Sequence, residues 1–71
     1  MGLCVKIVEE NGHARMRLYS PMSHECLMQE ELATNSPTLR TIIHVFWKER
    51  VEVQCDRALL TRIMRGERRK P

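Results

Sequence analysis

The chain has 71 residues, of which 42% are hydrophobic and 30% charged, and its formal net charge is +3. A chain of this length forms at most one domain, near the lower limit for a self-sufficient core, and its apolar content excludes wholesale disorder. The first residues of the sequence contain no apolar run long enough for a signal peptide or a membrane span. We therefore expect no membrane partner. The three cysteines are few and irregularly spaced, which argues against a disulfide framework and for a cytoplasmic location.

The charges are distributed unevenly along the chain. Residues 1–56 carry six basic and eight acidic side chains, whereas residues 57–71 carry six basic and one acidic. Such an asymmetry is typical of proteins that meet a polyanionic partner. We therefore expect a single domain over residues 1–65, followed by a mobile basic tail over residues 66–71.

The first elements predicted are two strands, about residues 3–9 and 13–19, joined by a tight turn. Asn11 and Gly12 suit a two-residue turn in which both central positions have positive φ, and the flanking runs alternate between apolar and polar residues. Turn chemistry and alternation agree on one register. It pairs Ile7 with Met16, Val5 with Leu18, Val8 with Arg15, Lys6 with Arg17 and Cys4 with Tyr19.

The next segment, "SPMSHECLMQEELA", supports two interpretations. Ser20 and Pro21 match a helix N-cap and first helical residue, and the acidic run that follows favours a helix, so a helix over about 21–33 is predicted. The alternative is a strand, in which soft donors would alternate along one face as in a copper(I) site. The four donors are Met22, His24, Cys26 and Met28. Their spacing lacks the close pairs that mark a preformed site, so no metal ligand is assigned.

The second half of the chain predicts two further helices and a short strand. Ser36 and Pro37 start an amphipathic helix over about 37–49, and Asp56 and Gly66 bracket another over about 56–65. Between them, residues 51–55 alternate and predict a third strand, with a continuation of the preceding helix as the alternative. The predicted fold class is thus α+β: an N-terminal hairpin packed on two or three short helices.

The candidate binding residues are basic side chains on two elements. The strongest set is the polar side of the last helix with the residues that follow it, because the planar guanidinium group suits phosphate and carboxylate. The second set is the outer face of the hairpin beside Tyr19, where a two-stranded ribbon can enter a major groove. Arg40 would contribute if residues 27–50 formed a helix-turn-helix. The complete set is Arg57, Arg62, Arg65, Arg68, Arg69, Lys70, Arg15, Arg17, Lys6 and Arg40.

No catalytic motif is present in the sequence: there is no phosphate-binding glycine loop, no nucleophile elbow and no placed Cys–His pair. We expect a non-enzymatic small basic regulator of gene expression, of phage- or plasmid-type size, without a cofactor. Its partner would be nucleic acid or an acidic surface of the transcription machinery such as RNA polymerase, and it would act as a monomer or a homodimer. The alternative is an adaptor or inhibitor of another host protein, acting through the hairpin edge and apolar helices. A Cu(I)-binding protein ranks third.

Overall fold

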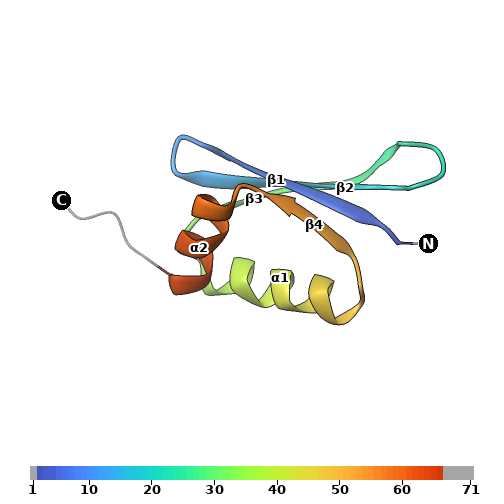
Figure 1. The fold of residues 1–71 in the computed structure, drawn as a ribbon. Coiled ribbons are helices and arrows are strands. Elements are labelled where there is room, and N and C mark those ends of the chain that lie inside the picture. The colour runs from blue at the N-terminus through green and yellow to red at the C-terminus, as the bar shows by residue number, and fades with distance from the viewer. Residues whose placement is uncertain (1, 67–71) are drawn as a thin grey trace.

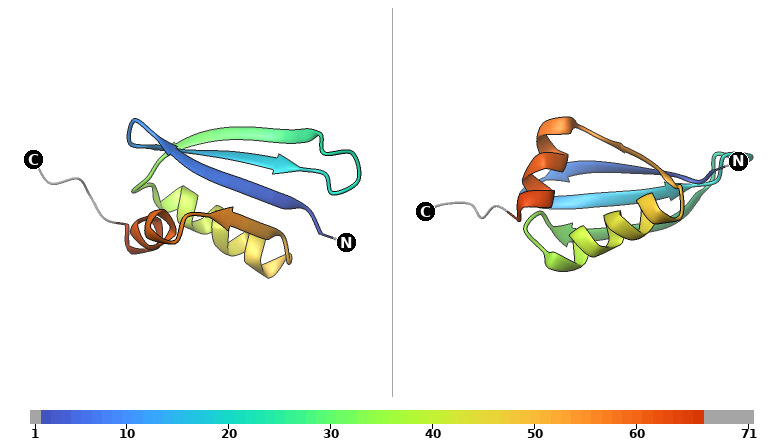
Figure 2. Two further views of the ribbon diagram at one scale, coloured as in Figure 1. Left: turned by 45° about the horizontal axis from the view of Figure 1, so that its top comes forward. Right: turned by 60° about the horizontal axis from the view of Figure 1, so that its bottom comes forward.

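The computed structural model describes residues 2–66 and shows an α+β fold with a four-stranded mixed sheet and two helices. The elements follow in the order β1 (Cys4–Glu10), β2 (His13–Tyr19), β3 (Cys26–Ala33), α1 (Pro37–Lys48), β4 (Glu52–Cys55) and α2 (Arg57–Arg65). The spatial order of the strands is β3-β2-β1-β4, with β4 parallel to β1 and the other neighbours antiparallel. Both helices lie on the same side of the sheet (Figures 1 and 2).

The N-terminal hairpin has the predicted register. Ile7 pairs with Met16 and Lys6 pairs with Arg17, and the other pairs expected from the alternation are also present. Asn11 and Gly12 both have positive φ, 52° and 79°, as a two-residue turn of this kind requires. Asn tolerates this left-handed backbone better than most residues, and Gly adopts it without a steric penalty. The turn residues therefore fix which side chains point to the core.

The predicted helix over 21–33 is wrong, because residues 26–33 form strand β3 along β2. The Ser20 side chain does accept a backbone N–H, as a cap would, but from Met22 within a turn, and no helix follows. The chain reverses direction through this turn, in which His24 has φ 61°. The same residues that favour a helix start also favour a hydroxyl-mediated turn, and pairing with β2 decides between them.

The helix boundaries in the second half agree with the sequence signals. The Ser36 hydroxyl accepts the N–H of Thr38 at the start of α1, and the Asp56 carboxylate accepts the N–H of Leu59 at the start of α2. At the end of α2, Gly66 adopts the left-handed conformation with φ 64°. Residues 52–55 form the short strand expected there, and β4 joins the sheet beside β1.

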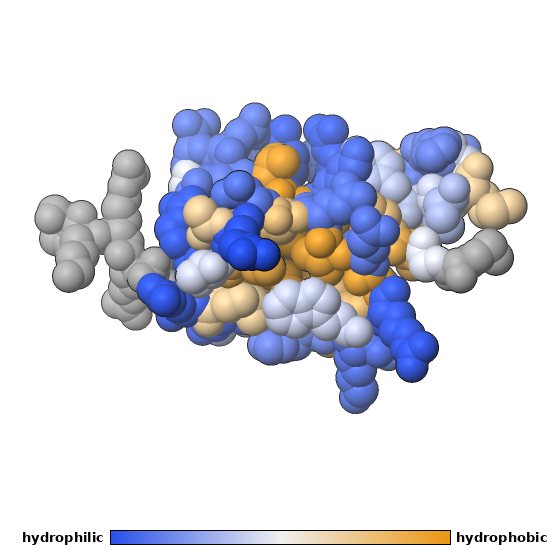
Figure 3. All heavy atoms as spheres, viewed as in Figure 1, coloured by the Kyte–Doolittle hydropathy of each residue, from blue (hydrophilic) through white to orange (hydrophobic). Residues whose placement is uncertain are grey.

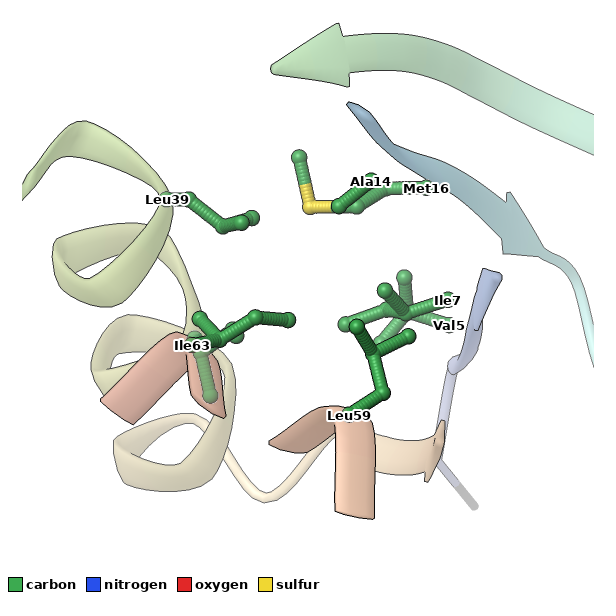
Figure 4. Packing of buried hydrophobic residues seen from close by; sticks show 8 residues of the cluster. Val5, Ile7, Ala14, Met16, Leu39, Leu59 and Ile63 are labelled. Carbon is green, nitrogen blue, oxygen red and sulfur yellow. The ribbon is translucent and has the colours of Figure 1, made fainter. Parts of the chain in front are cut away.

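The core lies between the sheet and the two helices (Figure 4). Val5 and Ile7 of β1 and Ala14 and Met16 of β2 point toward the helices, as the alternation predicts. Each helix contributes two buried side chains to the core, Leu39 and Ile43 from α1 and Leu59 and Ile63 from α2. The buried cluster is Val5, Ile7, Ala14, Met16, Leu39, Ile43, Leu59 and Ile63. Because both helices cover one face, the opposite face of the sheet is left open.

Candidate nucleic-acid interface

The structure separates the predicted basic residues into two surfaces on opposite sides of the molecule. Arg57, Arg62 and Arg65 belong to α2, which covers the core face of the sheet. Lys6, Arg15 and Arg17 belong to β1 and β2, and their register places them on the open face. Arg68, Arg69 and Lys70 lie outside the described residues. The sequence could not show this separation, because it depends on which face of the sheet α2 covers.

On α2, the guanidinium group of Arg62 is already engaged within the chain. Its Nη2 lies 2.5 Å from Oε1 of Glu9 and its Nη1 lies 3.2 Å from Oε2, so the two groups form a two-pronged ion pair. Arg62 therefore holds α2 against β1 rather than presenting an unpaired charge. Arg57 and Arg65 are exposed at the two ends of the helix.

Arg40 also has an intramolecular position. Its Nη1 is covered by neighbouring atoms, and its guanidinium group packs against Gly66 so closely that a Cβ at residue 66 would overlap it. The C-terminal end of a helix carries a partial negative charge, which a nearby guanidinium group stabilises. Residues 26–33 form a strand, so the helix-turn-helix that would have given Arg40 a partner-facing role is absent from residues 27–50.

The open face of the sheet carries a row of polar side chains that crosses all four strands. Lys6 pairs with Arg17 and with Gln54, and Arg17 pairs with Gln29. We call Gln29, Arg17, Lys6 and Gln54 the cross-strand row. The two cations of this row were predicted as binding residues from the sequence, but the two glutamines were not. Gln29 lies in a segment that was predicted to be a helix, and the strand that pairs with Gln54 could not be identified from the sequence.

Lys6 and Arg17 have no carboxylate within ion-pair distance among residues 2–66. The ammonium group of Lys6 lies 5.3 Å from the centre of the Tyr19 ring, a cation–π contact. The Nε of Arg17 is covered and has no hydrogen-bond acceptor in the described part of the chain. The centre of the open face thus combines two cations whose charge is not offset locally with one aromatic ring.

Acidic residues flank Lys6 and Arg17 on two sides, around Arg15 and at the β4 edge of the sheet. The Nη2 of Arg15 lies 2.5 Å from Oε1 of Glu10 and 3.1 Å from Oε2 of Glu31, so two carboxylates more than offset its charge. At the β4 edge, Gln54 donates a hydrogen bond of 2.9 Å to Glu52. Of the three cations predicted on the hairpin face, only Lys6 and Arg17 therefore remain suited to an anionic partner.

An open pocket lies where β4 ends and α2 begins, next to Lys6 and Gln54. Its walls include the side chains of Glu9 and Asp56 as well as Arg62. Its lining also includes Lys6, so two cations and two carboxylates balance each other there, and the pocket offers no net attraction for an anion. The centre of the open face differs from this pocket, because Lys6 and Arg17 have no carboxylate within ion-pair distance among residues 2–66.

The described structure separates the four soft donors of residues 22–28. A register irregularity between Leu18 and Tyr19 pairs Cys26 with Tyr19 and Met28 with Leu18, which places the two sulfur side chains on opposite faces of the sheet. Met22 lies in the preceding turn with 78% of its surface exposed. No group of three His, Cys, Asp or Glu residues suited to a metal ion occurs within residues 2–66.

The remaining cysteines are also free thiols. Burial, and then the nearby charge of Asp56, raises the pKa of the Cys55 thiol. A raised pKa lowers the fraction of reactive thiolate at neutral pH, which is the opposite of what a cysteine nucleophile needs.

Comparison of the chain with protein-family models, curated proteins and solved structures gives no match. Neither helix in the described range is both long and apolar enough to cross a membrane. We therefore infer the function from the geometry and charge of the surfaces described above.

Proposed function

We propose that this protein is a non-enzymatic, nucleic-acid-binding regulator of gene expression, and that the open face of its sheet is the main binding surface. One observation supports this most directly: Lys6 and Arg17 lie side by side in the middle of an uncovered sheet, next to Tyr19 and without carboxylate partners among residues 2–66. Lys and Arg that contact phosphates supply most of the affinity of such proteins.

Nucleic acid explains this surface better than an acidic protein surface such as one on RNA polymerase. Either partner would attract the two cations. Nucleic acid in addition offers a base that can stack on the adjacent aromatic ring, so it uses both features of the surface. On α2, the exposed Arg57 then contributes a secondary, less specific attraction from the other side of the molecule.

The test is the salt dependence of binding to labelled oligonucleotides, measured by fluorescence anisotropy. Each phosphate contact contributes roughly 0.7 (single strand) to 0.9 (duplex) to the slope of log affinity against log salt. Replacing Lys6 and Arg17 together by glutamine should reduce the slope by about 1.4 to 1.8. Arg57→Gln, which removes the same type of charge from α2, is the matched control and should reduce the slope by less. The proposal fails if no oligonucleotide binds at low salt or if binding is independent of salt.

A second candidate, the protein adaptor, is favoured by a different feature. β3 pairs along β2, and β4 pairs with residues 4–7 of β1, so most of the hairpin edge on which this candidate was predicted to dock is covered. The exposed edge is instead β3, which is eight residues long and carries Leu27 with 54% of its surface exposed. An edge strand of this length can accept a strand from a partner.

Leu27→Lys tests this candidate, since a lysine on an edge strand discourages strand addition. A protein captured from nuclease-treated lysate by the wild type and lost by Leu27→Lys would favour the adaptor. Equal capture by both proteins, or no capture by either, would argue against it.

A further inference from the structure

We propose that the open face of the sheet binds single-stranded nucleic acid in preference to duplex, with Tyr19 stacking on a base and Lys6 and Arg17 contacting the adjacent phosphates. This inference deepens the proposed function and rests on it. It identifies the form of nucleic acid and assigns a separate role to each of the three side chains.

The width of the sheet argues against insertion into a duplex groove. A major groove is about 12 Å wide and admits a two-stranded ribbon or one helix. Here β1 and β2 are the two central strands of four. Four strands span about 14 Å between the outer backbones at the usual interstrand spacing, before side chains are added. The hairpin therefore cannot act as a groove-inserted ribbon, which corrects the prediction made for its outer face.

The helices do not belong to the proposed surface. Both α1 and α2 pack their apolar sides on the core face of the sheet, opposite the face that carries Lys6, Arg17 and Tyr19 (Figures 1 and 2). A broad face of this kind suits a strand whose bases are unpaired, because unpaired bases can turn toward the protein and stack.

Tyr19 is placed to serve as the stacking platform. Its ring is partly buried in β2, where its neighbours across the strands are Cys4 and Cys26, both small side chains. At present the ammonium group of Lys6 lies over the ring. The exposed Lys6 stem is long and flexible, so the ammonium group can move to a phosphate when a base takes its place.

The charge pattern restricts the path of the phosphates. The two carboxylates around Arg15 make that part of the face negative, and Glu52 lies beside the far end of the cross-strand row. Phosphates are therefore favoured between these two acidic regions, over Lys6 and Arg17. The guanidinium group of Arg17 has no ion-pair partner among residues 2–66, and its terminal nitrogens, unlike the covered Nε, can donate to a phosphate oxygen.

Tyr19 variants test the stacking role. The probe is a fluorescein-labelled single strand of about ten thymidines, and its competitor is a hairpin duplex that offers more phosphates. Tyr19→Leu should weaken binding to the single strand by about 5- to 150-fold, the loss expected from one base–aromatic contact. Tyr19→Phe retains the ring and should bind within about threefold of the wild type. Circular dichroism of each variant checks that it is folded.

A measurement on the wild type does not depend on any variant folding. On addition of the single strand, backbone amide signals of Lys6, Arg17 and Tyr19 should shift by NMR, while those of Arg57 and of α1 stay in place. Shifts confined to α2 would overturn the inference.

The two proposals can fail separately. Salt-dependent binding that prefers the duplex, or that is equal for Tyr19→Leu and Tyr19→Phe, would refute the single-strand inference and leave the proposed function intact. Absence of binding to single strand and duplex at low salt would refute both.

Discussion

Met16 lies at the centre of the core face of the sheet and is fully buried. Its side chain points toward Leu39 of α1 (Figure 4), so truncation to alanine would leave a cavity that the rigid sheet cannot close. Such truncations of large aliphatic side chains lower the free energy of unfolding by about 2 to 5 kcal/mol. A domain of this size has a total of about 4 to 11 kcal/mol, so Met16→Ala should remove a large part of its stability.

The loss should be visible in thermal unfolding followed by far-ultraviolet circular dichroism. A loss of 1 kcal/mol shifts the midpoint of a small domain by about 4 to 8 °C, so a decrease of about 8 to 40 °C is expected. Met22→Ala is the matched control: Met22 is 78% exposed in the turn before β3, and its truncation should change stability by less than about 0.5 kcal/mol.

This pair of variants also tests the structure of residues 21–33. A helix over this segment would direct Met22 toward the core, whereas strand β3 leaves it exposed. If Met22→Ala costs as much stability as Met16→Ala, the assignment of β3 is refuted. A loss below about 1 kcal/mol for Met16→Ala would show that the core does not centre on the hairpin.

Three further predictions concern single contacts. Gly66→Ala and Gly12→Ala should each lower the free energy of unfolding in urea by about 1 kcal/mol because both positions have positive φ, and the new Cβ at residue 66 should add little because it displaces only the flexible end of Arg40; a loss below about 0.3 kcal/mol at either position would contradict this. Burial raises the pKa of the Cys55 thiol, so the unfolded chain loses this proton at lower pH than the native protein. The free energy of unfolding should therefore fall between about pH 8 and 10, and fall less in Cys55→Ala; parallel pH profiles would exclude the effect. A double-mutant cycle on Arg62 and Glu9 should give a coupling of only about 0.2 to 1 kcal/mol, since the side chains are 47% and 30% exposed, and the coupling should shrink in 1 M salt; a coupling that salt does not change would argue for a pair shielded from solvent.

Local signals predicted the elements whose boundaries are set by their own residues. The Asn11–Gly12 turn and the alternation beside it specified the hairpin register, and Ser36, Asp56 and Gly66 specified helix ends. In each case the decisive interaction joins residues close in sequence. For residues 51–55, a strand and a continuation of the preceding helix were both open from the sequence, because the strand's pairing partner β1 is distant along the chain.

Strand β3 was predicted as a helix because the alternation of apolar and polar residues along it is interrupted. The irregularity opposite Leu18 and Tyr19 leaves Leu27 exposed, and Glu30 occupies the core-side position between Met28 and Leu32 at the sheet edge. An edge strand tolerates such a residue because water reaches it. Without knowledge of the partner strand, the remaining apolar residues fit a helical projection equally well.

For the binding residues, the sequence identified the charges but not their surroundings. The pairing of Arg62 with Glu9 and of Arg15 with Glu10 and Glu31 depends on the folded arrangement. These pairs leave Lys6 and Arg17 as the cations of the open face. The cross-strand row could be recognised only after β3 and β4 had been placed on either side of the hairpin.

The place of β4 in the sheet also affects the order of events during folding. The hairpin closes through a two-residue turn and can form early, but the far side of β1 acquires its partner only when Val53 arrives from the other end of the described chain. Closing so long a loop is slower than closing a hairpin, because more chain entropy is lost before the contact forms. A nascent chain therefore carries an incomplete sheet until residues 52–55 have been made, and during that interval the backbone of residues 4–7 lacks its partner on the outer side of β1.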